Sequence, residues 1–547
     1  MPKICGKYIL TLTQGGKKQQ EETVYVKYVR RELDQLTDED RDIFLDAMVT
    51  MWKVSTVEGQ ILFGKDYKSA HYFIQVHIDA AGNSLCDEFH GGPGFLANHV
   101  YFTNYFEQSL RLVDPRTSLH YMEYTRYFDT DDYWETHMSN ANDGGAWLEF
   151  LTAKWFGTND PNTGQIIDGR WANIKVPRVS SAFYETHGIP EDEPFWESFK
   201  DGWMGFMNNH AHGYSPYGLQ RSVHSLSPNE YVLRFNNVDR LGDVRSFIDK
   251  AGTKYPYIGI TCDNYVSFLD RIKGSSKMLA SELTESRTHG LIHSAFGGGG
   301  GDPAAANDEV LMNKFGILES DLASITKWSH GMMKNDGPKL FTNQAPSQWN
   351  CTAFPSLKYG IEAIAASSKE LTEEFGMIEC DAPSQFYEDE ESVNLWLALF
   401  TGDKEFVHTN DNVFAQFDND QKRDLVKVLA NRGQYDGDMH TSAAAADPLF
   451  WVQHGGTERL WQWMEMHDYF SDEPFTQWEK CTGHSATGKL RWLKGYNLND
   501  ENLLADNLTV AELSDMLSPT SPAFEDNFNF IYEPTNFEWC PGMADLI

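Results

Sequence analysis

The sequence predicts a mainly α-helical fold with long loops and a few short strands. Apolar residues recur at helical spacing in four segments, whereas strand-like runs such as "IGITC", "YVLRF" and "FNFIYE" are short. Long polar connections rich in glycine and asparagine, such as residues 129–145 and 157–181, separate these segments. At 547 residues, 41% of them hydrophobic, the chain is long enough to bury a large core.

The first two helices are predicted from their boundary residues. Residues 24–53 begin extended and continue as a helix, in which Thr37 is the expected N-cap because acidic residues follow it in the first turn. Residues 95–113 place aromatic and aliphatic residues, together with His99, on one stripe of a second helix. Pro115 is expected to stop that helix.

Two further helices follow later in the chain. One is predicted from about residue 263 to 296, with a break near Gly274, and the other spans residues 451–470. Between them lies a block of roughly 135 residues that has no clear periodicity and opens with "GGGGGDPAAAND". So long a stretch without a pattern indicates a functional or inserted segment.

The predicted organisation has four parts. Residues 1–298 form the N-terminal part of the main domain, and residues 299–438 form an insertion that covers or fills a site. Residues 439–470 complete the main domain, and residues 471–547 are a C-terminal extension packed on the core.

Composition excludes some classes of partner. A formal net charge of −35 argues against nucleic acid or an anionic membrane, because both attract clustered Lys and Arg. The seven scattered cysteines contain no CxxC pair, so we expect neither a disulfide framework nor a zinc ribbon. The N-terminus has no apolar signal region, which predicts a cytoplasmic protein, or a secreted one if a leader has been removed. The oligomeric state is left open.

The histidines carry the chemical signal. His289 and His293 stand four residues apart, the spacing at which a helix delivers two imidazoles to one ion. His454 ends the apolar run "DPLFWVQH". His90 lies beyond a glycine-rich break and can fold back toward His99 on its helix. Among 18 histidines, isolated ones are more often hydrogen-bonded core residues than ligands, so the grouping is what matters.

The N-terminal set needs a third member. His71 and His77 are six residues apart and would point to different sides of a helix. At most one of them should therefore belong to the N-terminal histidine set. Two sets of three neutral imidazoles, without cysteine or carboxylate, suit copper, and zinc in a three-histidine site is the chemical competitor. Two sets side by side favour a metal pair.

These motifs resemble a known family. "HGGPGFLANHVYFTNYFE" is similar to the first copper signature of the tyrosinase, catechol oxidase and haemocyanin family of type 3 copper proteins. "DPLFWVQHGGTE" resembles its second signature, with Glu458 where the family has Asp, and "THGLIHSAFGG" resembles its paired-histidine segment. The segments "VRRELDQLTDEDRDIFLDAM", "NLTVAELSDML" and "FIYE" agree with the same family.

The resemblance implies a helical bundle that carries a dicopper centre. Two copper ions per chain would be held by six histidines, which are His77, His90 and His99 at one ion and His289, His293 and His454 at the other. His77 is preferred to His71 because "FIQVH" resembles the phrase before the family's first ligand. The partners implied are O2 and a small phenol, and the activity implied is oxidation of o-diphenols to o-quinones, with monophenol hydroxylation left open.

Further site residues follow from the same comparison. Phe450 matches an aromatic residue that packs beside a copper ligand, although plain core packing explains it equally well. Gly290 follows His289 where phenol-hydroxylating members often have Asn, which helps a Glu to hold a water, and Glu285 is the candidate for that Glu. Each copper ligand needs an acceptor for its second ring nitrogen, and Asp447, Glu458 and backbone carbonyls are the candidates.

The chain also departs from the family. Val100 follows His99 where most members have Arg, and 161 positions separate His293 from His454, far more than usual. Cys86 lies four residues before His90 rather than two, which argues against a Cys–His thioether. Two other functions stay open, a dioxygen carrier with the same copper pair and a divergent dicopper monooxygenase. The remaining alternative is a helical protein whose histidines bind no metal and share this spacing by coincidence.

Overall fold

The computed structural model describes only part of the chain. It covers residues 5–81, 88–90, 92, 94–128, 149–160, 164–175, 214–215, 218–219, 231–234, 261–297, 312–316, 350–358, 376–381, 418, 420–421, 424, 438–440, 443–471, 486–487, 508–533, 537 and 539–546. Helices dominate these residues, which confirms the predicted fold class. Most of the block 299–438 lies outside them.

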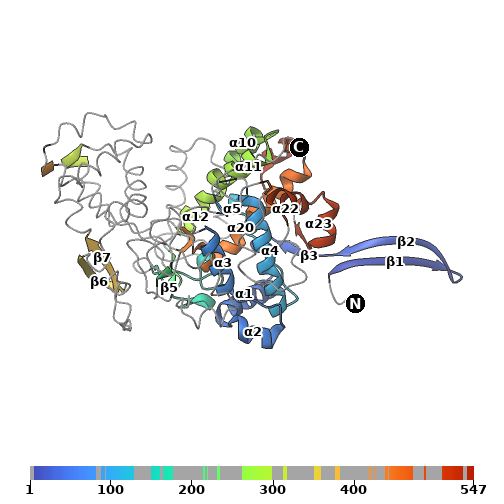
Figure 1. Cartoon of the computed structure of the whole chain (residues 1–547), viewed down its shortest axis with the longest axis horizontal. Coiled ribbons are helices and arrows are strands. Elements are labelled where there is room, and N and C mark those ends of the chain that lie inside the picture. Colours follow the sequence, from blue (N-terminus) through green and yellow to red (C-terminus); the bar gives the residue numbers. More distant parts are fainter. Residues whose placement is uncertain are drawn as a thin grey trace.

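Four helices form the centre of the molecule (Figure 1). They are α1 (Asp38–Lys53), α3 (Ala70–Ala81), α4 (Phe95–Val113) and α20 (Leu449–Met466). α4 packs against both α20 and α1, and α1 also packs against α3. A helix that is buried all round lies inside a protein rather than on its surface. That description fits α20, in which every residue from Leu449 to Glu465 is buried.

The predicted boundaries of the central helices agree well with the structure. The Thr37 hydroxyl accepts the Asp40 N–H and caps α1, as its position before three acidic residues predicts. α4 begins at Phe95 and ends at Val113, as predicted. α20 starts two residues earlier than predicted and ends at Met466.

Other helices surround this centre. They are α2 (Thr56–Phe63), α5 (Tyr124–Phe128), α10 (Cys262–Ile272), α11 (Lys277–Thr284), the π-helical turn η5 (Glu285–His289), α12 (Gly290–Gly297), α22 (Val510–Leu517) and α23 (Pro522–Asn527). The 3-10 turns are η1 (Leu33–Gln35), η2 (Glu149–Leu151), η3 (Gly169–Trp171), η10 (Asp438–His440), η11 (Ala444–Ala446) and η14 (Pro541–Leu546). The break predicted near Gly274 separates α10 from α11. Among the described helices, none combines the length and apolarity that a membrane crossing requires.

The described strands form four small two-stranded sheets. β1 (Gly6–Gln14) and β2 (Lys17–Val26) make an antiparallel hairpin that projects from the helical body (Figure 1). β3 (Tyr28–Arg31) pairs in parallel with β8 (Phe530–Glu533). The other pairs are β4 (Tyr214–Ser215) with β5 (Gly218–Leu219) and β6 (Asn350–Lys358) with β7 (Gly376–Asp381).

The C-terminal segment packs against the N-terminal part of the chain through the β3–β8 sheet. In the β3–β8 sheet the Arg30 guanidinium lies 3.5 Å from the Phe530 ring centroid and donates to the Tyr532 hydroxyl at 2.8 Å. A disulfide bond joins Cys262 on α10 to Cys540 just before η14. The sequence predicted no disulfide framework, and it did not predict this single bond. Spacing could not reveal it, because the partners lie 278 residues apart.

Candidate metal centre

The first group of histidines gathers between α3 and α4. His77 comes from α3, His99 from α4, and His90 from the described residues 88–90 that lead toward α4. Ring centroids lie 5.4 Å apart for His77 and His90, 5.7 Å for His77 and His99, and 5.1 Å for His90 and His99. One ring nitrogen of each lies within 4.8 Å of the others. The three side chains can therefore hold one metal ion.

The second group joins segments that are far apart in sequence. His289 ends the turn η5, His293 lies on α12, and His454 lies on α20. Ring centroids are 4.5 Å apart for His289 and His293, 4.2 Å for His289 and His454, and 5.7 Å for His293 and His454. Their nitrogens also lie within 4.8 Å of one another, which defines a second possible metal site.

The two groups are adjacent. His99 of the first stacks on His454 of the second, with centroids 4.3 Å apart and ring planes 18° apart. The ring centroid of Phe450 lies 5.1 Å from that of His77 and 4.1 Å from that of His454, so Phe450 contacts both groups. Phe95 lies 4.8 Å from His99 and 4.9 Å from His289 and does the same. Two phenyl rings therefore surround a paired site and limit the access of water.

Backbone and hydroxyl groups fix the second nitrogen of three rings. The Phe95 carbonyl lies 2.8 Å from His99 Nδ1, and the Met439 carbonyl lies 2.5 Å from His293 Nδ1. A carbonyl can only accept, so each Nδ1 carries the proton and each Nε2 keeps its lone pair. For His289, the Thr457 hydroxyl lies 3.2 Å from Nδ1. This is the outer contact that a metal-binding imidazole usually makes.

The remaining nitrogens suit a metal better than a protein partner. His99 Nε2 and His454 Nε2 are buried without a hydrogen-bond partner in the described part of the structure. The Nε2 atoms of His289 and His293 lie 2.9 Å apart. Buried lone pairs without a donor are costly unless an ion occupies the space between them.

Electrostatics keep these rings neutral. Burial lowers the pKa of His99, His289 and His454 well below the ordinary imidazole value, and neighbouring imidazoles lower it further. Neutral imidazole is the form that binds a metal. These three rings therefore have the protonation state that copper or zinc requires at neutral pH.

Comparison with known proteins finds a family match over part of the chain. The model of the common central domain of tyrosinase matches residues 67–311. Over this segment, the chain is similar to tyrosinases. The match covers both histidines of the paired segment and all three of the first group, whereas His454 lies beyond it. No curated protein matches the chain.

The paired histidines of this tyrosinase-like segment stand on a distorted helix. The Gly290 N–H donates to the Glu285 carbonyl, five residues back, which makes η5 a π-helical turn. Such turns are frequent at functional sites because they re-aim side chains within a helix. Here the turn ends at His289, whose ring faces His293. The extra residue of the turn lies before His289, so the predicted arrangement of His289 and His293 one α-helical turn apart is kept.

Two glycines let α20 approach its neighbour. A Cβ added at Gly455 would lie 2.8 Å from the Tyr121 Cβ, and one at Gly456 would lie 2.4 Å from the Met122 carbonyl oxygen. The Met122 N–H donates to the Val452 carbonyl at 2.9 Å. The glycines after His454 thus allow close packing of the helix that carries it.

The two carboxylates suggested as acceptors for ring nitrogens bind other groups. Asp447 binds Arg234 through two contacts of 2.8 and 2.7 Å and also accepts the Leu449 N–H. Both charged side chains are fully buried. The pair anchors the start of α20 and so positions His454 indirectly. Backbone carbonyls, the third candidate, serve His99 and His293 instead.

Glu458 belongs to a second buried network. Its Oε2 lies 2.8 Å from Arg30 Nη1 and accepts the Thr103 hydroxyl at 3.1 Å. Arg30 also binds Glu107 at 2.6 Å. Burial raises the pKa of Glu458, whereas the charges of Arg111 and Arg30 outweigh burial and lower the pKa of Glu107. The network ties α4 to α20 one turn beyond the stacked histidines.

The structure separates His71 from the site. His71 Nε2 lies 3.1 Å from the Lys175 carbonyl, and burial lowers its pKa to about 4. It is a hydrogen-bonded core histidine, whereas His77 lies in the first group. Cys86 lies outside the described residues, so the structure does not test the expectation that it forms no thioether.

Sequence reasoning missed several supporting residues. Thr457 lies three positions after His454, but nothing in the sequence indicates that it contacts His289, 168 residues away. Gln453, which donates to the His289 carbonyl at 3.0 Å, was missed for the same reason. Arg234 stands in the short strand-like run "YVLRF", and nothing in that run indicates its pairing with Asp447, 213 residues away.

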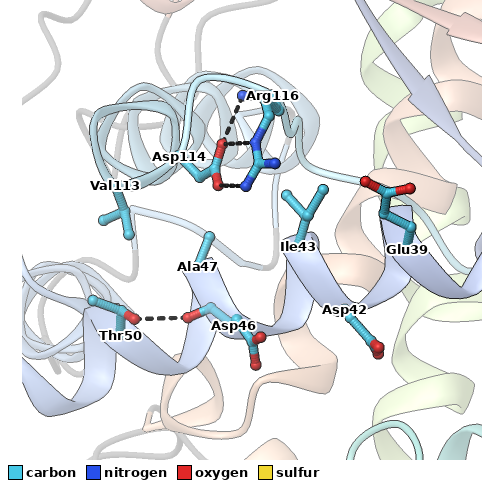
Figure 2. Close-up of a pocket in the computed structure, with 9 residues that line it drawn as sticks. All are labelled: Glu39, Asp42, Ile43, Asp46, Ala47, Thr50, Val113, Asp114 and Arg116. Carbon is cyan, nitrogen blue, oxygen red and sulfur yellow. Dashed lines mark hydrogen bonds and ion pairs between the residues drawn. The ribbon is translucent and has the colours of Figure 1, made fainter.

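A surface cavity is separate from the histidines. Its volume is about 410 Å³, and it lies between α1 and the residues that follow α4 (Figure 2). Ile43 and Ala47 point toward the far wall, whereas Asp42 and Asp46 point away from it. Arg170 binds both of these carboxylates. None of the six histidines lines the cavity.

Proposed function

We propose that this protein is a copper-dependent oxidoreductase that uses O2 to oxidise o-diphenols to o-quinones. The observation that carries the proposal is the pair of three-histidine groups joined by the stacked rings of His99 and His454. The match to the tyrosinase central domain supports the same conclusion. Six imidazoles without a cysteine or carboxylate favour copper over the harder metals.

The proposed ligands divide into two sets. His77, His90 and His99 would hold one copper ion, and His289, His293 and His454 would hold the other. A bound copper pair supplies the exchange of two electrons between a diphenol and O2. The protein orients its ligands through the Phe95 and Met439 carbonyls and the Thr457 hydroxyl.

The aromatic residues control the surroundings of the site. Phe95 and Phe450 are fully buried and contact rings of both groups, which supports a role in excluding water. His90 and His293, one from each group, are the two ligands that are partly exposed. We therefore expect substrate to approach from the side on which these two rings lie.

We propose that o-diphenols are better substrates than monophenols. A diphenol can lose its protons as it binds, whereas a monophenol needs a positioned base before it reacts. Gly290 has no side chain to orient Glu285 or a water held by it. The Glu285 carbonyl already accepts the Gly290 N–H within the π-helical turn.

The block 299–438 is proposed to cover the copper site as a lid or to fill it in place of substrate. Its two ends must both return to the second histidine group, because His293 precedes it and His454 follows it. The Met439 carbonyl, immediately after the block, accepts from His293 Nδ1, which supports this placement. Proteolysis within the block should activate the enzyme if the block fills the site, and should broaden selectivity if it is a lid.

Two other functions use the same site. A dioxygen carrier would bind O2 but would not turn over catechol. A divergent dicopper monooxygenase would act on an unusual substrate and leave simple catechols unchanged. The completely buried Phe450 favours neither alternative by itself, since a carrier and an oxidase both need a dry metal pair.

The first experiment tests the metal site. Copper-loaded protein should contain about two copper ions per chain, and exposure to O2 or peroxide should produce a near-ultraviolet band. His454→Ala should lower the copper content to about one per chain, and His71→Ala should leave it at two. An unchanged content in the first variant would contradict the assignment of ligands.

The second experiment tests the reaction. Catechol and a matching monophenol should be supplied separately while O2 consumption is measured. Turnover of catechol supports the oxidase, and an O2-dependent band without turnover supports the carrier. Equal rates for both phenols with no lag would overturn the diphenol preference. Gly290→Asn should raise the ratio of monophenol to diphenol activity, with Gly290→Ala as the control for the 3.0 Å approach of a new Cβ to the Glu285 carbonyl.

A further inference from the structure

The β1–β2 hairpin exposes apolar side chains on a projecting arm. Ile9, Leu10 and Leu12 on β1 are 66%, 59% and 62% exposed. In the described structure, the sheet contains only these two strands, and the hairpin extends away from the helical body (Figure 1). A two-stranded sheet is marginally stable by itself in water. A nine-residue edge strand with exposed apolar side chains is also a template for pairing with another strand.

From this arm we infer that the protein self-associates through β1. We propose that β1 of one chain pairs in antiparallel fashion with β1 of a second copy across a two-fold axis. The two hairpins would then form one four-stranded sheet. Such a contact is isologous, so the same residues face one another from both sides.

The choice of a second copy rests on charge. Each chain has a formal net charge of −35, so contact between two helical bodies would be opposed by strong repulsion. The hairpin is different, because it carries three lysines against two glutamates. Its position on a projecting arm keeps the acidic bodies apart while the strands pair.

The β1 sequence is self-complementary. From Tyr8 to Gln14 it has no charged side chain, so pairing with itself places no like charges opposite one another. β2 carries Lys17, Lys18, Glu21 and Glu22, and this makes it the poorer partner. The outer edge of β1 is therefore the expected contact.

The apolar residues define a register. If the two-fold axis passes through Leu10, then Leu10 faces Leu10 of the other copy, and Tyr8 faces Leu12 in both directions. These residues share one face of the strand because side chains alternate. Ile9 and Thr11 would pair on the other face. These pairs involve only the five residues from Tyr8 to Leu12 of each strand, so the interface is small and association should be weak and concentration-dependent.

Sedimentation and light scattering on the full chain test the association. We expect the mass to rise from 62.3 kDa toward twice that value as protein concentration increases. Salt should strengthen the dimer, because it screens the repulsion between the acidic bodies. If basic arm residues instead docked on the acidic body of another copy, salt would weaken the dimer. That result, or a monomer under all conditions, would overturn the proposal.

Variants locate the interface. Leu10→Lys should remove the dimer, since a lysine at a strand edge opposes pairing. Gln20→Lys on β2 adds the same charge to the same hairpin and should leave the dimer intact. Equal loss in both variants would contradict pairing through β1. Copper content and catechol turnover serve as folding controls, because the hairpin lies away from the histidines.

A cross-linking variant avoids any effect on hairpin stability. In a Cys5→Ser background, Leu10→Cys should form a disulfide-linked dimer under mild oxidation, because the two introduced thiols face each other in the proposed register. Gln20→Cys in the same background should remain unlinked. A dimer that fails to cross-link through Leu10→Cys would exclude this register and overturn the proposed pairing.

Discussion

The buried ion pair at the start of α20 gives a sharp test of how the second histidine group is supported. Arg234 donates from Nε and Nη2 to the two carboxylate oxygens of Asp447, and its Nη1 donates to the carbonyls of Phe156 and Gly157. Arg234→Met preserves most of the side-chain length but leaves the Asp447 carboxylate without its cation. Both side chains are 0% exposed, so water cannot replace the lost partner.

The expected magnitude follows from that burial. Removing one member of a buried ion pair typically costs about 3–5 kcal/mol, because a charge remains in a poorly polarisable environment. Two backbone carbonyls also lose a donor, which adds about 1–3 kcal/mol of desolvation where they stay buried. We therefore expect a loss of at least about 3 kcal/mol, a large part of the roughly 5–15 kcal/mol by which a domain is usually stable.

Urea unfolding measures this loss. Tryptophan fluorescence and far-ultraviolet circular dichroism should be recorded together, and a free energy should be derived where the two transitions coincide. Arg116→Met is the matched control, because Arg116 also makes two contacts to an aspartate but is 65% exposed. That variant should lower the stability far less than Arg234→Met, because water screens an exposed ion pair. Similar small losses for Arg116→Met and Arg234→Met would refute the reasoning.

Three further predictions concern single contacts. Thr457→Val removes the hydroxyl beside His289 Nδ1 and should weaken copper binding at the second site by about 10- to 100-fold in a chelator competition, whereas Thr457→Ser should retain it. Burial lowers the pKa of His120 to about 3, so its neutral form stabilises the fold above pH of about 6.5 and that contribution is lost as pH falls toward 3. His120→Asn should therefore flatten the decline of stability between pH 6 and 4 by up to about 1.4 kcal/mol per pH unit; an unchanged slope would contradict it. Cys540→Ser should lower stability by about 2–5 kcal/mol, and reducing agent should then have no further effect through this bond.

Local patterns explain the parts of the fold that sequence could predict. α1 and α4 have clear apolar periodicity and boundary residues, and both occur where they were expected. The β1–β2 hairpin was not predicted from the sequence. Gly15 and Gly16 between two strand-like runs are nevertheless a recognised turn signal. Both have positive φ angles, which glycine adopts without strain.

Long-range pairing explains the parts that sequence could not predict. The disulfide between Cys262 and Cys540 and the ion pair between Arg234 and Asp447 each join segments more than 200 residues apart. The residues next to a cysteine or a carboxylate in the sequence do not indicate which distant residue it will contact. The histidines could be grouped in advance only because their spacing and flanking residues matched a known pattern.

The α4–α20 contact links stability to the proposed chemistry. His99 and His454 stack, and one turn further along each helix Thr103 contacts Glu458. A shift of either helix would therefore break a buried hydrogen bond and separate the two rings together. Since His99 belongs to one group and His454 to the other, the spacing between the two histidine groups is fixed by helix packing rather than by any loop. This explains how a block of roughly 135 residues can stand between His293 and His454 without changing the geometry of the pair.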